Sequence, residues 1–399
     1  MIKAIKLTNF LSFESEEIHL DKYLTVLVGI NGAGKSNLLK AIKLLKEGVA
    51  GTGLKKFVID VLGGFDNICF KSENRKKDSI ELQYVLDSDI IKSFGFPFVE
   101  DILYSIELHK ISGTGNYYVK ESVKNEKGFI YLDFDHGNGV LNELDRSELK
   151  IKKTKLVNYS DFIDSTELAL SKVFDTDRYF ALSTIRKAIN DIQIYEYFDT
   201  TSKSLIRKPM LPTSEKRLLP DGVNLPQILN TIKINYKSSY LKIIEMLQLV
   251  NPNFNGFDFN FIGGNIELML DEKDLNSSIH VSSISDGTLR YLCLLSILFN
   301  PDRGRLICID EPEVGLHPDM ISQIGHSFIE SSESSMYIIS THSENFIDCF
   351  MLENIRIFEK VENNSTKSFL YSKEDFTGWY EVFSVGKMWR QGDLGGNRW

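Results

Sequence analysis

The chain has 399 residues, of which 42% are hydrophobic and 25% charged, and its 46 basic and 55 acidic side chains give a net charge of −9. This composition is typical of a folded globular protein and excludes a disordered, collagen-like or small disulfide-stabilised chain. Apolar stretches fall short of the roughly 20 residues of a membrane span, the start lacks a secretory pattern, and the four cysteines form no CxxC pair, so we expect a cytoplasmic protein without a zinc site.

Apolar periodicity predicts strands and helices along the whole chain. The expected strands are 2–10, 16–20, 24–29, 79–86, 103–111, 306–310, 336–340 and 355–360. The expected helices are 35–45, 165–174, 226–234, 287–299 and one that begins at Pro318. Strands that alternate with helices indicate an α/β fold in which helices cover a sheet. No sustained heptad is visible, so we expect no long coiled coil.

The strongest motif is GINGAGKS at Gly29–Ser36, which matches G-x-x-x-x-G-K-[ST] between an expected strand and an expected helix. Glycines let successive backbone N–H groups turn toward a phosphate chain, and the helix N-terminus adds the positive end of its dipole. Lys35 adds a positive charge, and the Ser36 hydroxyl is a ligand for Mg²⁺. The residues expected to bind the nucleotide here are Gly29, Asn31, Gly32, Ala33, Gly34, Lys35, Ser36 and Asn37.

A second motif, LICIDEPE at Leu306–Glu313, is an apolar strand that ends in two adjacent carboxylates. Asp310 suits the outer sphere of Mg²⁺, and Glu311 suits a general base that orients or deprotonates the attacking water. Adjacent acids would repel a polyphosphate, so we expect Mg²⁺ to be obligatory.

The third motif is ISDGTLR, in which Ser285, Asp286 and Gly287 open an expected helix. The hydroxyl and the backbone N–H groups of this turn form a second anion-binding cradle, although a simple helix N-cap explains the same residues.

The fourth motif is IISTHS, where an apolar strand ends at His342. The spacing from Asp310 leaves room for a loop, a helix and a returning strand, so we expect both residues at one sheet edge, with His342 against the terminal phosphate. A second histidine, His317, suits a structural or interface position instead of a metal site.

Together these motifs resemble the ATP-binding-cassette ATPase superfamily, in particular its soluble SMC/RecF/OLD-like branch. The resemblance rests on NFLSF (Asn9–Phe13), GINGAGKSN as Walker A, SDGT as a divergent signature, CIDEPEVGLHP as Walker B with its D-loop, and STHS as the switch histidine. It implies an ABC-ATPase head with a mixed β-sheet core and an inserted α+β or helical subdomain. On that basis we expect residues 1–90 to form an N-terminal lobe, 91–240 the insertion and 241–399 a C-terminal lobe.

The resemblance also implies a mechanism. Two chains would pack head to tail, so that ATP on the Walker A loop of one is closed over by Ser285–Gly287 of the other, with Lys35, Glu311 and His342 as catalytic residues and Ser36 and Asp310 on Mg²⁺. The expected partners are a second copy of the chain, in a homodimer or a larger assembly, together with a separate effector or nuclease and DNA. The ending, residues 385–399, resembles stand-alone bacterial members associated with phage defence or other two-gene systems.

Two departures from the family pattern stand out. No glutamine is assigned as the Q-loop residue, for which Gln83, within an expected strand, is a candidate, and the residues after His342 are too few for a Toprim nuclease domain. Two basic clusters, 146–155 and 203–217, are either solvated faces or a DNA-phosphate track. The three tryptophans of the tail pack on the protein's own core or dock on a partner: Trp379, Trp389 and Trp399.

Two other classes compete with this interpretation. The nucleotide-binding subunit of a membrane transporter is disfavoured by the long insertion and by the EPEVGLHP loop. A P-loop kinase or GTPase would have no use for the ISDGT turn or for His342.

Overall fold

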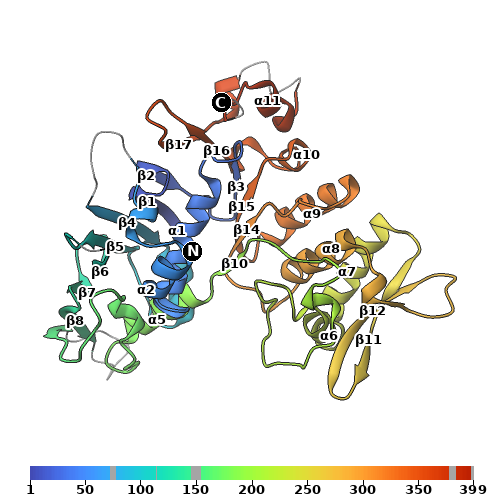
Figure 1. Cartoon of the computed structure of the whole chain (residues 1–399), viewed down its shortest axis with the longest axis horizontal. Helices are drawn as coiled ribbons and strands as arrows, with labels where there is room; N and C mark the ends of the chain where they lie inside the picture. The colour runs from blue at the N-terminus through green and yellow to red at the C-terminus, as the bar shows by residue number, and fades with distance from the viewer. Residues whose placement is uncertain (72–77, 114, 145–153, 377–382, 397–399) are drawn as a thin grey trace.

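The computed structural model describes residues 1–71, 78–113, 115–144, 154–376 and 383–396. Three sheets organise these residues, of eight, six and three strands. The six-stranded sheet lies at the centre, with the eight-stranded sheet on one side and the three-stranded sheet on the other (Figure 1).

The central sheet is almost entirely parallel. Its order is β10 (Gln193–Tyr195), β14 (Leu306–Asp310), β15 (Met336–Thr341), β3 (Leu24–Val28), β16 (Ile355–Lys360) and β17 (Thr366–Leu370), and only β17 runs antiparallel to its neighbour. Its inner strands β14, β15 and β3 are buried on both faces along almost their whole length, as expected for a parallel sheet.

Alternate side chains of this sheet enter two separate hydrophobic clusters. Leu27, Cys308 and Ile338 belong to the first, and Ile309 and Ile339 belong to the second. Because side chains of a strand alternate between faces, the two clusters lie on opposite faces of the same sheet.

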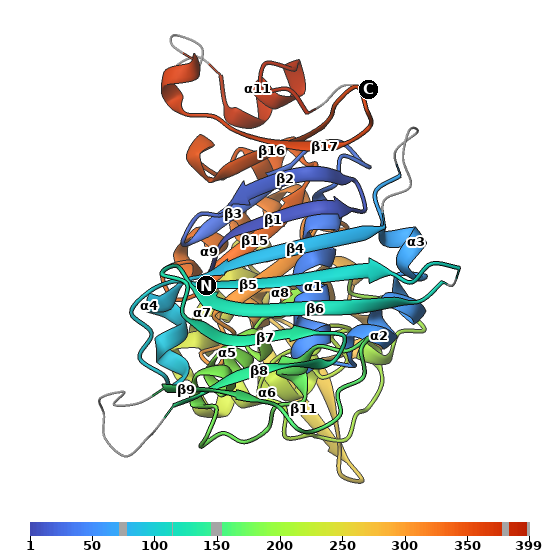
Figure 2. The ribbon, with the colours of Figure 1, turned by 90° about the vertical axis from the view of Figure 1, so that its left-hand side faces the viewer.

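The first cluster is covered by α1 (Lys35–Ala50), α5 (Phe180–Asn190) and the eight-stranded antiparallel sheet (Figure 2). In the order of pairing, its strands are β2 (Phe13–His19), β1 (Ile2–Phe10), β4 (Ser79–Leu86), β5 (Ile102–Lys110), β6 (Tyr117–Asn125), β7 (Ile130–Asp135), β8 (Asn138–Leu144) and β9 (Thr154–Asn158). Residues of β4 to β6 alternate between buried and partly exposed, so one face packs on the helices and the other meets solvent.

The second cluster lies among four helices and the small sheet. The helices are α6 (Leu225–Asn235), α7 (Lys237–Val250), α8 (Asp286–Leu298) and α9 (Pro318–Ser331), and the strands are β11 (Phe254–Ile262), β12 (Asn265–Glu272) and β13 (Ile279–His280). The shorter helices of the chain are α2 (Leu54–Lys56), α3 (Phe65–Ile68), α4 (Ser88–Ile91), α10 (Glu344–Ile347) and α11 (Val385–Gln391).

Most expected elements are confirmed, but the helix over 165–174 is wrong. The structure has only a 3₁₀ turn there, Ala169–Ser171. The carboxylate of Glu121 on β6 accepts hydrogen bonds from the N–H groups of Ala169 and Leu170. In a helix, these two N–H groups would instead donate to carbonyl groups of the preceding turn. The division at residues 90 and 240 stays a prediction; β4 and β5, on either side of residue 90, pair in one sheet.

In the described part of the chain, no helix has both the length and the apolar character needed to cross a membrane.

Candidate active site

The Gly29–Asn37 loop joins β3 to α1 and is packed tightly on one side. Gly34 caps α1 with a φ of 110°, and a Cβ there would lie 2.5 Å from Thr366 Oγ1 and 2.8 Å from Ser12 Oγ. A Cβ on Gly32 would meet no atom within 4 Å. The loop therefore has an open side at Gly32, and the absence of a side chain there leaves the cradle that a phosphate chain requires.

Lys35 lies inside this loop. Its Nζ donates to the carbonyl oxygens of Gly29 at 2.6 Å and Ile30 at 3.1 Å. Burial lowers the pKa of the Lys35 ammonium, and the nearby carboxylates of Glu311, Asp310 and Glu313 oppose that shift. The two carbonyl groups are neutral acceptors for the Lys35 ammonium. A triphosphate in the loop would give this ammonium an anionic partner, which forms a stronger hydrogen bond.

Ser36 and Asp310 lie side by side, because β3 and β14 both flank β15 in the central sheet. Ser36 Oγ is 3.4 Å from Asp310 Oδ1, and the Ser340 hydroxyl also donates to Asp310. Among the described residues, no group of three or more His, Cys, Asp or Glu side chains could hold a metal. A hydroxyl beside one carboxylate fits Mg²⁺, which keeps several waters and takes its other ligands from phosphate oxygens.

Glu311 and His342 come from adjacent parallel strands and meet at the carboxyl edge of the sheet. His342 Nδ1 is 2.9 Å from Glu311 Oε1. Glu311 has a left-handed backbone with φ of 48°, and its N–H donates to the carbonyl and the hydroxyl of Ser340. Such backbone strain clusters at functional sites, and here the surrounding hydrogen bonds hold the turn that directs the Glu311 carboxylate.

Four further residues support the site. Ser340 bridges Asp310 and Glu311, and the STHS motif contained it. Glu313 is buried and accepts a hydrogen bond from the Thr341 hydroxyl, and burial raises the pKa of the Glu313 carboxyl. Sequence reasoning did not assign a role to either of them.

The other two supporting residues are Ser12 and Thr366, which hold the Walker A loop from outside. Asn37 Nδ2 and the Thr366 hydroxyl both lie 2.8 Å from Ser12 Oγ, and Thr366 also donates to the carbonyl of Ala33. Ser12 lies in the NFLSF segment, whereas no sequence signal points to Thr366, which reaches the loop from β17.

The Ser285–Gly287 turn begins a different helix, α8, from the one that follows the Walker A loop, α1. Ser285 caps α8, and its Oγ accepts the N–H of Thr288 at 3.1 Å. Helix α8 packs in the second hydrophobic cluster, whereas α1 packs in the first, so the signature turn and the Walker A loop belong to opposite faces of the central sheet. One turn along α8, Arg290 donates to the carbonyl of Val314 at 3.0 Å and to Tyr197 Oη at 2.6 Å, which ties α8 to the segment after Glu311.

Two further candidates, Gln83 and His317, form side-chain hydrogen bonds outside the Gly29–Asn37 loop. Gln83 lies within β4, where its amide donates to Glu81. The loop after β10, which carries Glu196 and Tyr197, borders the same hollow as Asp310 and Glu311, at the carboxyl edge of the central sheet. His317 caps α9.

The described residues among the two basic clusters and the three tail tryptophans differ in burial and in bonding. In the cluster 203–217, the guanidinium groups of Arg207 and Arg217 bond within the chain, while its three lysines are exposed. Trp389 is buried in the second hydrophobic cluster. Residues 146–153, Trp379 and Trp399 lie outside the described residues.

Comparison with known proteins gives a family match. Residues 24–348 match the AAA_21 family, described as "AAA domain, putative AbiEii toxin, Type IV TA system". A Helicobacter pylori (strain ATCC 700392 / 26695) protein named "ATP/GTP phosphatase" is 24% identical over 384 residues, which cover 94% of this chain and 93% of that protein.

Solved structures show the same fold. An SMC head bound to the C-winged helix domain of ScpA aligns with a TM-score of 0.59 at 15% identity, over 94% of this chain and 99% of that one. An SMC head with an extended coiled coil, bound to the C-terminal domain of ScpA derived from Pyrococcus furiosus, has a TM-score of 0.59 at 12% identity, over 95% and 98%. The chain belongs to the AAA_21 family and is a P-loop ATPase with the fold of an SMC head.

Proposed function

We propose that this ATPase is a switch in which two copies close head to tail around ATP and separate after hydrolysis. One observation carries the proposal: the Walker A loop and the Ser285–Gly287 turn begin helices that pack on opposite faces of one sheet. A turn on the opposite face is badly placed to cover the phosphates bound by its own chain. A second copy, related by a two-fold axis, would bring this turn to the open side at Gly32.

Each side chain has a distinct role in the proposed reaction. Lys35 and the loop N–H groups bind the phosphates, and Ser36 and Asp310 hold Mg²⁺, which when bound neutralises charge on the phosphate oxygens. Glu311 accepts a proton from the attacking water, and His342, at 2.9 Å, orients that carboxylate beside the terminal phosphate. Release of phosphate removes the anion shared by the two copies, so the dimer opens.

The wider role also needs a partner. The family description names a toxin of a type IV toxin–antitoxin system, and the solved SMC heads were bound to domains of ScpA. These likenesses support an ATPase that acts with a separate effector in phage defence or DNA maintenance. DNA binding belongs to the proposal as well, and it predicts an apparent affinity that falls steeply with salt.

Complementation between two inactive variants tests the composite site. Lys35→Ala removes the Walker A cation but leaves the signature turn, whereas Ser285→Arg blocks the signature turn but leaves Walker A. Each variant alone should be inactive. In an equimolar mixture half of the dimers are mixed, and each of these has one intact site, so phosphate release should return to about a quarter of the wild-type rate.

Two outcomes would contradict the proposal. In the first, the mixture stays as inactive as its components although both variants bind to each other. In the second, wild-type turnover per chain stays constant on dilution through the range where only monomer is present. As a control, mixing Lys35→Ala with Asp310→Asn should restore nothing, because both changes damage the same half of the site.

A further inference from the structure

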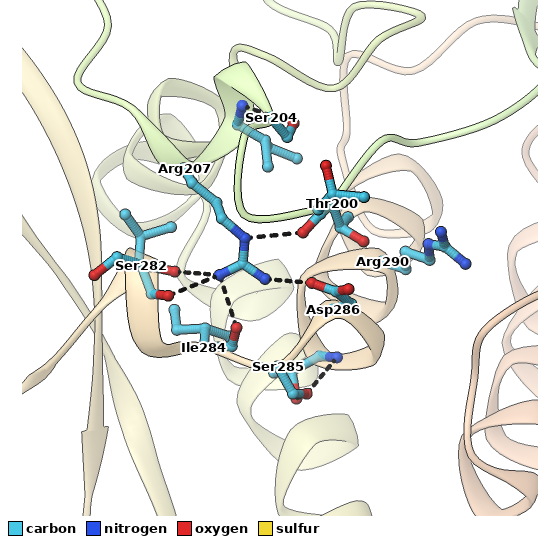
Figure 3. Close-up of polar contacts among 12 residues, drawn as sticks. Thr200, Ser204, Arg207, Ser282, Ile284, Ser285, Asp286 and Arg290 are labelled. Carbon is cyan, nitrogen blue, oxygen red and sulfur yellow. Dashed lines mark hydrogen bonds and ion pairs between the residues drawn. The ribbon is translucent and has the colours of Figure 1, made fainter.

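The turn that leads into α8 is held by one side chain from a remote part of the chain, Arg207. Its side chain is only 6% exposed. The guanidinium donates from Nε to the carbonyl of Thr200 at 2.8 Å and from Nη1 to those of Val281 at 2.7 Å and Ile284 at 2.8 Å (Figure 3). Its Nη2 forms an ion pair of 2.5 Å with Asp286.

These partners span the junction of two helical segments. Val281–Ser283 is a 3₁₀ turn, and α8 begins at Asp286. A cation is favourable at the carbonyl end of the first segment, and a carboxylate is favourable in the first turn of the second. Arg207 therefore joins the end of one segment to the start of the next, and only the peptide units of Ile284 and Ser285 lie between them.

A lysine cannot make the same set of contacts. The planar guanidinium presents donors in several fixed directions, whereas an ammonium is a single centre on a flexible stem. Arg207 contacts the carbonyl groups of Val281 and Ile284 before α8 and the Asp286 carboxylate in its first turn, and its Nε donates to Thr200 (Figure 3). Ser285 therefore lies between two residues that Arg207 contacts, Ile284 through its carbonyl and Asp286 through its carboxylate.

The same segment has a second arginine anchor that does not touch the signature turn. Arg217 donates to the carbonyl of Asp302 at 2.6 Å and pairs with Asp191 at 2.6 Å. Asp302 precedes β14, and Asp191 precedes β10. Arg217, whose side chain is 34% exposed, is therefore a reference for the loss of an arginine of residues 199–217 that bonds within the chain.

We propose that Arg207 is a positioning residue that holds Ser285–Gly287 in the form that closes over the triphosphate bound by a second copy. The inference rests on the proposed head-to-tail dimer. Because Arg207 packs beside α8 and the Walker A loop lies on the other face of the sheet, its loss leaves nucleotide binding by a single chain intact.

The experiment uses the full chain with Glu311→Gln, which retains ATP. Dimerisation with Mg-ATP is measured by sedimentation over a concentration series, and nucleotide affinity by titration at a concentration where the chain is monomeric. Adding Arg207→Lys should weaken the ATP-dependent dimer by about tenfold or more and leave the single-chain nucleotide affinity within about twofold. Adding Arg217→Lys should change neither quantity beyond about twofold.

Asp286→Asn provides a second variant, because the Asp286 side chain is 58% exposed and its change endangers folding less. It should weaken the dimer in the same direction, with a melting temperature close to that of the parent. The inference is overturned if Arg207→Lys and Asp286→Asn dimerise like the parent, or if Arg207→Lys lowers single-chain nucleotide affinity equally. Failure of the Glu311→Gln parent to dimerise instead identifies the proposed function as wrong and removes this inference with it.

Discussion

His342 Nδ1 lies 2.9 Å from Glu311 Oε1, although the two residues follow different strands and are separated in the sequence by a loop, helix α9 and strand β15. Their backbones are joined as well, because the N–H of Glu311 donates to Ser340, two residues before His342. The histidine therefore contacts the carboxylate that is proposed to activate water. Because of this contact, we expect the two side chains to act as one functional unit.

Glu311→Gln and His342→Gln should consequently have non-additive effects. Each single change should lower kcat for ATP hydrolysis, Glu311→Gln by about 10²- to 10⁴-fold, and the double variant should be no slower than Glu311→Gln alone. Steady-state phosphate release measures all three, with His326→Gln, an exposed histidine of α9, as the control. If the double variant instead lowered kcat by the product of the two single reductions, His342 would act independently of Glu311.

Lys35→Met should weaken nucleotide binding by about 10- to 100-fold, because a charge-assisted contact to phosphate is lost. The free energy of unfolding should not fall in parallel, since the variant removes a buried ammonium whose pKa burial already lowers. Titration with a fluorescent ATP analogue, together with thermal unfolding, separates the two effects. Lys40→Met, on the same helix, should leave binding unchanged; an equal loss in both variants would mean that helix charge, and not the position of Lys35, decides affinity.

Gly34→Ala should mainly lower the melting temperature, whereas Gly32→Ala should mainly lower nucleotide affinity. Both glycines have positive φ, 110° and 84°, so both variants share a cost of about 1–2 kcal/mol. Only the Cβ at position 34 would collide, at 2.5 Å from Thr366 Oγ1, so Gly34→Ala should have the lower melting temperature. Gly32→Ala places its Cβ on the open side of the loop and should mainly lower nucleotide affinity.

The role of Thr366 in that collision can be checked directly. Adding Thr366→Ala to Gly34→Ala removes the two Thr366 atoms that crowd the new Cβ, while Ser12 Oγ stays, and should recover part of the lost melting temperature. If the double variant is no more stable than Gly34→Ala, the contact with β17 is not what requires glycine at position 34.

Glu121 should make the stability of the protein depend on pH. Burial raises the pKa of this carboxyl to about 7, against the hydrogen bonds from Tyr104, Leu170 and Ala169. The folded state thus binds the proton more tightly than the unfolded state, so stability from this group is present below about pH 4.5 and is lost as pH rises through about 7. Denaturant unfolding from pH 5 to 8 should show this decline in the wild type.

Comparison with a second variant isolates that contribution. Glu121→Gln cannot ionise, so its free energy of unfolding should be flatter across the same pH range, whatever its absolute stability. A decline of equal slope in Glu121→Gln would assign the pH dependence to other groups.

Much of the nucleotide site could be predicted from the sequence because its signals are local. Gly29–Ser36, Asp310–Glu311, Ser285–Gly287 and His342 each follow or open an element whose apolar periodicity is clear, and backbone geometry alone places them at strand or helix ends. Local patterns were insufficient where a remote side chain competes for backbone groups. Residues 165–174 have helical periodicity, but Glu121, more than 40 positions away, accepts two of their N–H groups.

The sequence by itself determined which residues are candidates to bind phosphate, hold a metal and activate water, because those candidates belong to short motifs. Only the tertiary structure decided the order β14, β15, β3, which brings Asp310, Glu311 and His342 beside the Walker A loop. It also brought Thr366 against Gly34 and Arg207 against the signature turn. These contacts join residues far apart in the chain, and they depend on how whole elements pack, which no local pattern specifies.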